Sequence, residues 1–263
     1  MKPIEKMPAA VKKGIRCVLA DIDDTLTLDG RLPAVVFAAM EDLKKAGTRM
    51  VPITGRPAGW CDHIARMWPV DGIVGENGAF YFHYDDSRRK MKRRYFKTEK
   101  QRKIDSKKLE KLKGVILSQI PGCRVSADQQ YREADLAIDY CEDVPPLPIE
   151  DVDRIVRLFE EAGARAKISS IHVNGWFGEY DKLTMTRLLF AEVFKDDLAA
   201  VKEHIIFIGD SPNDVPMFDF FPHSVAVANI LQFKEKINPK PAWVTRQEGG
   251  YGFAEMVDLL LAK

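Results

Sequence analysis

In the first and last thirds of the chain, short apolar runs alternate with segments whose apolar residues recur at helical spacing. The run from Ile15 to Ala20 predicts a fully buried strand. Residues 33–46 carry apolar side chains three or four positions apart and are followed by Gly47, which predicts a helix. Similar patterns predict strands at 50–53, 72–74, 205–208, 225–227 and 243–244 and helices at 57–67, 182–194, 212–218 and 253–261. Strands that alternate with helices predict an α/β fold with a doubly wound parallel sheet, a Rossmann-like core.

The middle of the chain has a different rhythm. Strand-like segments at 79–84, 91–96, 124–127, 136–140 and 167–173 accompany helical patterns at 104–120 and 150–162. Several β segments with two helices, and no polar crevice motif between them, predict a separate α+β domain inserted into the first. We expect residues 1–82 and 177–263 to form the core and residues 83–176 to form the inserted domain.

Composition and charge exclude few classes of protein. The chain has 263 residues, 40 basic against 39 acidic, and a formal net charge of +1, so the overall charge names no partner. A hydrophobic fraction of 46% is ordinary for a globular protein. The sequence has no apolar run of transmembrane length, and its first residues lack the apolar core of a signal peptide. We therefore expect a cytoplasmic protein without a membrane partner.

Cysteines and histidines show none of the spacings typical of metal sites. The cysteines are scattered without a CxxC pair, and Cys17 lies inside the first predicted strand. This pattern favours reduced structural thiols, and we expect neither zinc nor redox chemistry. The residues concerned are Cys17, Cys61, Cys123, Cys141, His63, His83, His172, His204 and His223.

Three carboxylates follow the first predicted strand directly. Because side chains alternate along an extended chain, Asp21 and Asp23 share a face if that geometry persists past Ala20. Two carboxylates that converge in a partly dry crevice need a cation or a shared proton. A hard divalent ion such as Mg²⁺ would relieve the repulsion and leave one carboxylate free to attack phosphorus. A solvated acidic loop that caps the next helix explains Asp21, Asp23 and Asp24 equally well.

A second acidic cluster follows the apolar strand 205–208. Ser211, with Pro212 next and Asp214 three residues on, is typical of a helix N-cap with a capping-box acid. That structural explanation leaves Asp210 without a role, although an acid directly after a buried strand is costly unless something pairs with it.

Two further loops offer groups that bind anions. Lys182 opens a helix, where the helix dipole disfavours a cation, so an anion at this point would explain its position. Thr54 and Gly55 offer a hydroxyl and backbone amides at another helix start. The alternative explanations are that Lys182 is an ordinary exposed lysine in the first turn of a helix and that Thr54 simply caps the start of its helix. The loops at Asp21, Thr54, Lys182 and Asp210 together supply a nucleophile, a hydroxyl, a cation and metal-binding acids, as phosphoryl transfer requires.

These segments resemble, motif by motif, the haloacid dehalogenase superfamily, in its subgroup with a large α/β cap. Asp21-Ile22-Asp23-Asp24-Thr25 is similar to the first motif, Thr54-Gly55-Arg56 to the second, Lys182 to the third, and the segment 209–214 to the fourth. Glu76-Asn77-Gly78-Ala79 also resembles the subgroup. The insert lies between the second and third motifs, where that subgroup carries its cap.

The resemblance implies a role for each matched residue. Asp21 would attack phosphorus and become an aspartyl phosphate, while Asp23 would protonate the leaving oxygen and then activate water. Thr54 and Lys182 would hold the phosphoryl oxygens. Further candidates for the phosphate site are Gly55, Arg56 and Asn213. The implied magnesium ligands are Asp21, the backbone carbonyl of Asp23, and Asp210, with support from Asp214.

The resemblance also implies a small phosphate ester as substrate, and we expect a phosphorylated sugar. A phosphomannomutase-like phosphotransferase is the alternative within the same subgroup. Candidate sugar contacts in the cap are His172 and Asn174, and also Arg132 and Glu133, although ordinary polar surface explains them as well.

A basic segment suggests a rival function. Residues 88–113 contain fourteen lysines and arginines against Glu99, Asp105 and Glu110, which would suit a non-catalytic nucleic-acid or phosphate-binding module. A solvated hairpin and helix face explains the same pattern and is the preferred interpretation, because every catalytic side chain of the motifs is retained. We expect no nucleic-acid partner.

Overall fold

A parallel sheet forms the centre of the protein in the computed structural model, which describes residues 1–233, 235 and 237–262. Its strand order is β1-β13-β12-β11-β2-β3, and every neighbouring pair is parallel. The strands are β1 (Lys2–Pro3), β2 (Cys17–Ala20), β3 (Arg49–Pro52), β11 (Ile205–Gly209), β12 (His223–Ala226) and β13 (Trp243–Val244). The predicted doubly wound parallel sheet is therefore confirmed.

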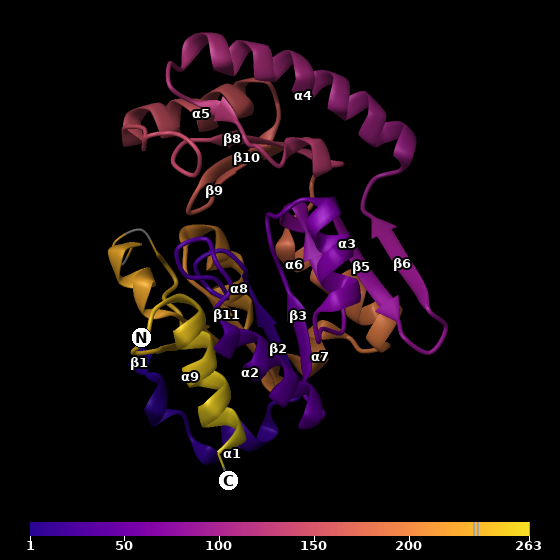
Figure 1. The fold of residues 1–263 in the computed structure, drawn as a ribbon, viewed down its shortest axis with the longest axis vertical. Helices are drawn as coiled ribbons and strands as arrows, with labels where there is room; N and C mark the ends of the chain where they lie inside the picture. The colour runs from indigo at the N-terminus through magenta and orange to yellow at the C-terminus, as the bar shows by residue number, and fades with distance from the viewer. Residues whose placement is uncertain (234, 236, 263) are drawn as a thin grey trace.

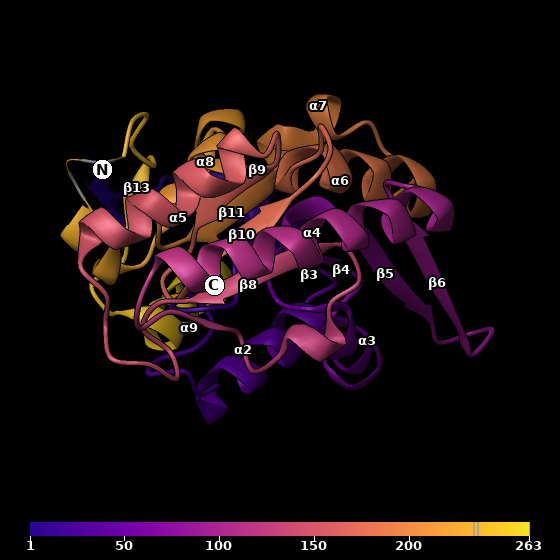
Figure 2. The ribbon, with the colours of Figure 1, turned by 90° about the horizontal axis from the view of Figure 1, so that it is seen from above.

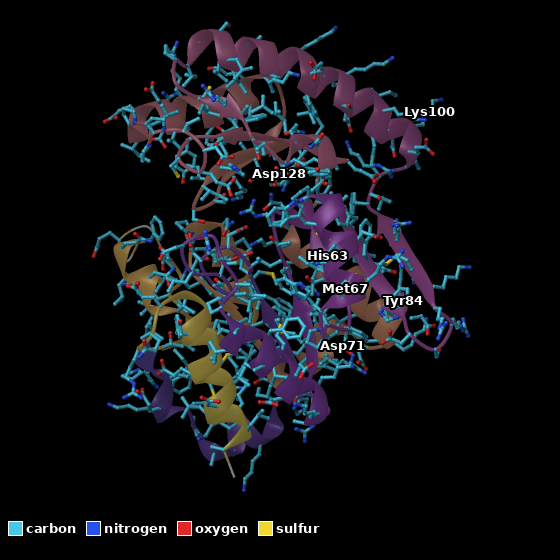
Figure 3. The ribbon with its side chains drawn as sticks, in the orientation of Figure 1. His63, Met67, Asp71, Tyr84, Lys100 and Asp128 are labelled. Carbon is cyan, nitrogen blue, oxygen red and sulfur yellow. The ribbon has the colours of Figure 1, made fainter. Side chains whose placement is uncertain are left out.

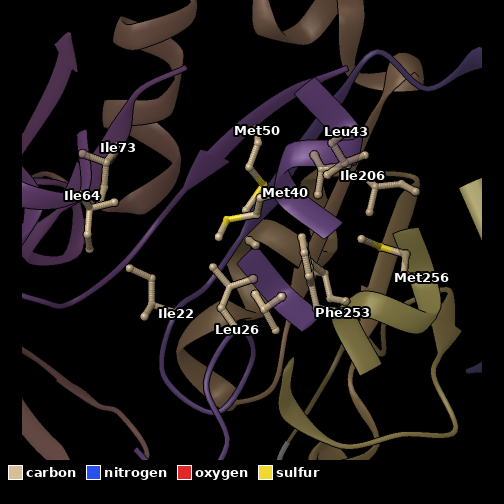
Figure 4. Packing of buried hydrophobic residues seen from close by; sticks show 14 of the residues in the cluster. Ile22, Leu26, Met40, Leu43, Met50, Ile64, Ile73, Ile206, Phe253 and Met256 are labelled. Atoms are coloured by element: carbon tan, nitrogen blue, oxygen red, sulfur yellow. The ribbon is translucent and has the colours of Figure 1, made fainter. Parts of the chain in front are cut away.

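Helices cover both faces of this sheet because its central strands are apolar on both sides. Val18 and Ile206 face the helices α2 (Ala34–Lys45), α3 (Ala58–Met67) and α9 (Gly249–Leu261), and Figure 4 shows part of this cluster. Leu19 and Phe207 face the opposite cluster, which includes α6 (Lys182–Leu189) and α8 (Val215–Phe220). Two short helices, α1 (Ala9–Gly14) and α7 (Leu198–Val201), complete the core.

An antiparallel sheet leads out of the core beside α3 (Figure 1). It consists of β4 (Ile73–Gly75), β5 (Phe80–Asp85) and β6 (Lys90–Tyr95). A single parallel bridge from Ile53 to Val74 joins it to the end of β3. The chain therefore leaves the core along a hairpin that is anchored next to the Thr54 loop.

A third sheet lies above the carboxyl ends of the core strands (Figure 1). Its order is β7-β8-β10-β9, built from β7 (Arg124–Val125), β8 (Asp135–Asp139), β9 (Arg165–Ile168) and β10 (His172–Trp176). The helices α4 (Glu99–Gln119) and α5 (Ile149–Glu161) cover its outer face, as the view from above shows (Figure 2). We propose this sheet and its helices as the cap, within the expected range 83–176.

Alternation along the cap strands separates an apolar face from a polar one. Ile138 and Val173 pack against α4 and α5 in one apolar cluster. Their neighbours Asp139, His172 and Asn174 are buried as well but point to the other side of the sheet. The polar face of the cap sheet is therefore directed towards the core.

Three predicted elements differ from the structure. The helix expected from residue 104 begins at Glu99, because Thr98 and Gln101 form a capping box with N···O distances of 3.0 and 3.4 Å. The single strand expected at 167–173 is wrong: a turn in which Ser169 N donates to His172 O divides it into β9 and β10. The helix expected at 182–194 ends as α6 at Leu189 and continues as a π-helical turn, η4 (Phe190–Phe194). Within the described ranges, no helix is both long enough and apolar enough to span a membrane.

Two glycines provide a matched test of packing in the cap. A Cβ at Gly175 in β10 would overlap the ring of Phe159, so we expect Gly175→Ala to lower the free energy of unfolding by about 1–3 kcal/mol. A Cβ at Gly114 in α4 would meet no described atom within 4 Å, so Gly114→Ala should raise it by up to about 1 kcal/mol. Denaturant titration measures both values, and equal effects of the two substitutions would contradict this packing.

Candidate active site

Four segments that are far apart in the sequence meet at the carboxyl ends of β2 and β11. The parallel register places Ile208 beside Ala20, and Asp21 N donates to Ile208 O over 3.0 Å. Asp21 and Asp210, the next polar residues of the two strands, therefore lie together. One carboxylate oxygen from each of Asp21, Asp210 and Asp214 lies within 4.8 Å of the other two. All three side chains are buried.

Lys182 enters this cluster from the first residue of α6. Its Nζ donates to Oδ1 of Asp21 over 3.0 Å and to Oδ1 of Asp214 over 2.8 Å. Burial disfavours the charge of Lys182, but the two carboxylates outweigh burial and raise its pKa. Asp181 caps the helix by accepting a hydrogen bond from Thr184 N over 2.7 Å. These contacts explain the cation at a helix start: Lys182 is held there by two anions.

The cluster carries more negative charge than Lys182 can neutralise. Burial raises the pKa of Asp21 to about 7, although Lys182 opposes this shift. Burial, followed by the charges of Asp21 and Asp214, raises the pKa of Asp210 well above its ordinary value. Oδ1 of Asp210 accepts a hydrogen bond from Thr25 over 3.0 Å, but Oδ2 has no partner among the described residues. A buried set of oxygen donors with one unsatisfied atom fits a hard divalent cation.

The predicted capping box at Ser211 is wrong. The Ser211 hydroxyl donates to Oδ1 of Asn213 over 2.8 Å, and within the described chain the serine makes no side-chain cap. Oδ2 of Asp214 instead accepts a hydrogen bond from Asp210 N over 3.2 Å, while its Oδ1 binds Lys182. A Cβ at Gly209 would overlap this carboxylate, so the glycine is needed for Asp214 to fold back under the end of β11.

The Thr54 loop lies next to the cluster but does not cap α3, whose N-cap is Pro57. The buried Thr54 hydroxyl accepts a hydrogen bond from Arg56 N over 3.0 Å. A Cβ at Gly55 would lie 3.2 Å from Nδ2 of Asn77, so a side chain at this position would crowd the loop. The N-capping explanation of Thr54 is therefore wrong, and Gly55 serves a close packing contact.

Arg56 binds Asp23 and joins it to the cap. Its Nε donates to the two oxygens of Asp23 over 2.9 and 3.1 Å. Its Nη atoms reach Glu142 over 3.0 Å and Asp128 over 3.4 Å, and its Cζ lies 4.5 Å from the ring centre of Trp60. Asp128 lies on the side of the cap nearest the core (Figure 3). Arg56 is thus surrounded by carboxylates on the side of Asp23 that faces the cap.

The four cap residues expected from the sequence have partners of their own. His172 Nε2 lies 2.9 Å from Glu142 Oε2, and this close approach contributes most to lowering the pKa of Glu142 to about 2. Asn174 donates to Asp135 over 3.1 Å. Arg132 donates to Asp128 and Asp135 and to the backbone oxygen of Gly55, whereas the side chain of Glu133 pairs with Arg102. His172, Asn174 and Arg132 therefore belong to a buried polar network rather than to open surface.

Glu76, known from the sequence only as part of a segment that resembles the subgroup, joins the cap to the core, a role that was not predicted. The buried carboxylate of Glu76 accepts hydrogen bonds from Ala58 N at the start of α3 and from the backbone of cap residues 133–135, over 2.6–3.2 Å. Burial raises the pKa of Glu76 to about 8, although the hydrogen bonds from these backbone N–H groups act to lower it. The φ angles of Glu76, Asn77 and Gly78 are 43°, 54° and 106°. An Asn-Gly pair after a strand was the available signal for this left-handed turn.

A doubly wound sheet with buried carboxylates at the carboxyl ends of its strands is typical of α/β proteins that bind ligands at that edge. The family model for haloacid dehalogenase-like hydrolases matches residues 18–187 and 191–246, and the chain belongs to this family. The predicted family and the prediction of an enzyme, a phosphatase, are confirmed.

Individual relatives agree with this assignment. Phosphoglycolate phosphatase 1 of Saccharolobus solfataricus is 26% identical over 252 residues, which cover 94% of this chain and 96% of that protein. A crystal structure from Thermoplasma acidophilum has a TM-score of 0.69 at 20% identity and covers 94% of this chain and 98% of its own. Sucrose-phosphatase of Synechocystis, solved with sucrose and phosphate, has a TM-score of 0.64 at 14% identity and covers 93% and 97%. The two structures show that the fold is shared.

Neutralising one acid of the cluster should stabilise the protein when no metal is bound. Burial makes the folded state bind protons on Asp21 and Asp210 more tightly than the unfolded state, so the free energy of unfolding falls as the pH rises from about 4 towards 7. We expect Asp210→Asn to raise it by about 1–2 kcal/mol at pH 8 in chelator, and by less at pH 5. Denaturant titration at the two pH values measures both gains.

Asp139 is the matched control for this prediction. Its carboxylate is also buried, but it accepts hydrogen bonds from the backbone of Cys141, Glu142 and Asp143 over 2.8–3.0 Å. Asp139→Asn should therefore lower the free energy of unfolding by about 1–3 kcal/mol. If both amides destabilise the protein to the same extent, the cluster is not under electrostatic strain.

Proposed function

We propose that this enzyme is a Mg²⁺-dependent phosphomonoester hydrolase that works through a phosphorylated Asp21. The observation that carries the proposal is the buried cluster of Asp21, Asp210 and Asp214 around Lys182, with one carboxylate oxygen unsatisfied among the described residues. The relatives named phosphoglycolate phosphatase support phosphate esters as the substrate class.

The two half-reactions use both carboxyl groups of the first loop, Asp21 as nucleophile and Asp23 as acid and then base. The carboxylate of Asp21 attacks phosphorus, the bond from phosphorus to the ester oxygen breaks, and Asp23 gives its proton to that oxygen. Asp23 then takes a proton from water, which attacks phosphorus and releases phosphate and Asp21. Arg56 bonds both oxygens of Asp23 and so fixes the direction of that carboxyl group.

Other residues bind the phosphoryl group and the metal. Lys182 and Thr54 hold phosphoryl oxygens. The backbone at Gly55, beside Thr54, and the side chain of Asn213, in the loop after β11, are further candidates for the phosphate site. The groups that would hold magnesium are the carboxylates of Asp21 and Asp210 and the backbone carbonyl of Asp23, with Asp214 in support. Bound magnesium supplies positive charge that offsets the carboxylates and stabilises the developing charge on the phosphoryl oxygens.

We propose a sugar phosphate as the substrate, because the leaving-group side of Asp23 is rich in carboxylates. Asp128 and Glu142 flank Arg56 there and already pair with it. An anionic leaving group such as glycolate would enter among these acids, whereas the hydroxyls of a neutral sugar would find hydrogen-bond acceptors.

The central prediction concerns Asp21. We expect Asp21→Asn to lower kcat for a generic aryl phosphate by on the order of 10³-fold or more, because the amide cannot attack phosphorus. Chelation of the wild-type enzyme should abolish phosphate release, and added Mg²⁺ should restore it. Hydroxylamine should trap the acyl phosphate of the wild type during turnover.

Asp219→Asn, which changes an exposed acid of α8, is the matched control and should leave kcat unchanged. Wild-type turnover that persists in excess chelator would refute the role of the metal. A hydrolase releases one phosphate for each ester consumed, whereas an enzyme that transfers the phosphoryl group to a second sugar releases little free phosphate.

Charge near Asp23 should control the choice between esters. Glu142→Gln removes one negative charge beside Arg56, so kcat/KM for phosphoglycolate should rise about fivefold relative to that for a hexose phosphate. Asp143→Asn, at the next position in the chain, is the control and should leave this ratio unchanged. A ratio that does not respond to Glu142→Gln would show that the leaving group does not approach these acids.

A further inference from the structure

A cavity of about 490 Å³ opens beside Asp23 and Arg56, a volume typical of small-molecule sites. The walls come from α3, from the loop after the first motif and from the cap turn at Tyr131. Apolar and aromatic side chains predominate among them: Ile22, Leu32, Trp60, Ile64, Trp68 and Tyr131. The lining is mainly apolar, and its polar members include Asp23, Arg56 and His63.

Two of these aromatic side chains are unusually exposed for their size. Trp60 on α3 is 43% exposed and Tyr131 in the cap turn is 50% exposed, although both border the same cavity. The guanidinium of Arg56 lies over the Trp60 ring, with its Cζ 4.5 Å from the ring centre. The cavity therefore offers aromatic surface from the core and from the cap together.

Gly59 shows that the meeting of core and cap at this point is built into the sequence. It is the second residue of α3, so it lies in the first turn of the helix. A Cβ at Gly59 would lie 2.9 Å from the Cβ of Tyr131, too close for two carbon atoms. The helix thus carries a glycine where the tyrosine of the cap must sit against it.

Asp23 connects this cavity to the reaction. In the proposed function, on which this inference rests, Asp23 gives a proton to the leaving oxygen, so the leaving group begins at the polar end of the cavity. A two-carbon group such as glycolate ends close to Asp23. A larger leaving group extends past Arg56 to the aromatic walls.

We propose that this cavity is the subsite for the sugar ring of the leaving group. A pyranose ring has a flat face of C–H groups, which packs on aromatic surface, and a polar edge of hydroxyls. The C–H face packs against Trp60 and Tyr131. The hydroxyls form hydrogen bonds with Asp23, Arg56 and His63. The acids around Arg56 favour a neutral ring over an anionic one.

The experiment compares two esters in the same variants. Tyr131→Ala and Trp60→Leu should raise KM about three- to tenfold for the hexose phosphate that the wild type hydrolyses best, with kcat little changed, as expected for the loss of one aromatic contact. KM for phosphoglycolate should stay within twofold of the wild-type value. Tyr251→Ala, which removes another half-exposed tyrosine on α9, is the control and should change neither KM.

Gly59→Val gives an independent test, because it displaces Tyr131 without altering Trp60 or Arg56 themselves. It should reproduce the increase in KM that is selective for the hexose phosphate. Equal increases for both esters, or no increase for either, would overturn the ring subsite. Both of those results leave hydrolysis intact, whereas loss of the proposed function would appear as no metal-dependent phosphate release from any ester by the wild type.

Discussion

The structure depends on an electrostatic constraint: three buried carboxylates lie together at the ends of two neighbouring strands, and two of them, Asp21 and Asp214, share one lysine. Asp21 and Asp210 are placed together by the register of β2 and β11, and Lys182 reaches Asp21 from the start of α6. The strands pair because their side chains are apolar on both faces, so the same residues that build the core force the acids into one small volume. Burial then raises the pKa of Asp21 and of Asp210, and a bound cation would offset this effect.

Buried charged groups also join the cap to the core. Glu76 collects backbone N–H groups from α3 and from the cap, and Arg56 gathers carboxylates from both parts of the chain. The side chains of Glu76 and Arg56 are both buried, where a charged group without its partner would cost several kcal/mol. Arg56 contacts the proposed acid Asp23, the ring of Trp60 and the acids of the cap, so in the proposed function it would couple selectivity to catalysis.

The local elements could be predicted from the sequence because periodicity records which face of an element is buried. The helices α2 and α3, the strands β2 and β11, and the placement of four polar loops at one edge of the sheet all follow from it. Contacts between residues distant in sequence cannot be predicted from periodicity. Arg56 and Glu142 are separated by 86 positions, and Glu76 and Asp135 by 59. The capping-box prediction failed for a related reason: Asp214 had two buried partners, Asp210 N and Lys182, that a local pattern cannot show.

A crystal structure of the protein soaked with Mg²⁺ and beryllofluoride, a phosphoryl analogue, tests the central claim most directly. The account predicts beryllium bonded to a carboxylate oxygen of Asp21, with the metal ion between this group and Oδ2 of Asp210, which has no hydrogen-bond partner in the described part of the chain. Beryllofluoride oriented by Lys182 and Thr54 would complete the agreement. A metal ion bound away from Asp210, or an analogue held by a residue other than Asp21, would contradict it.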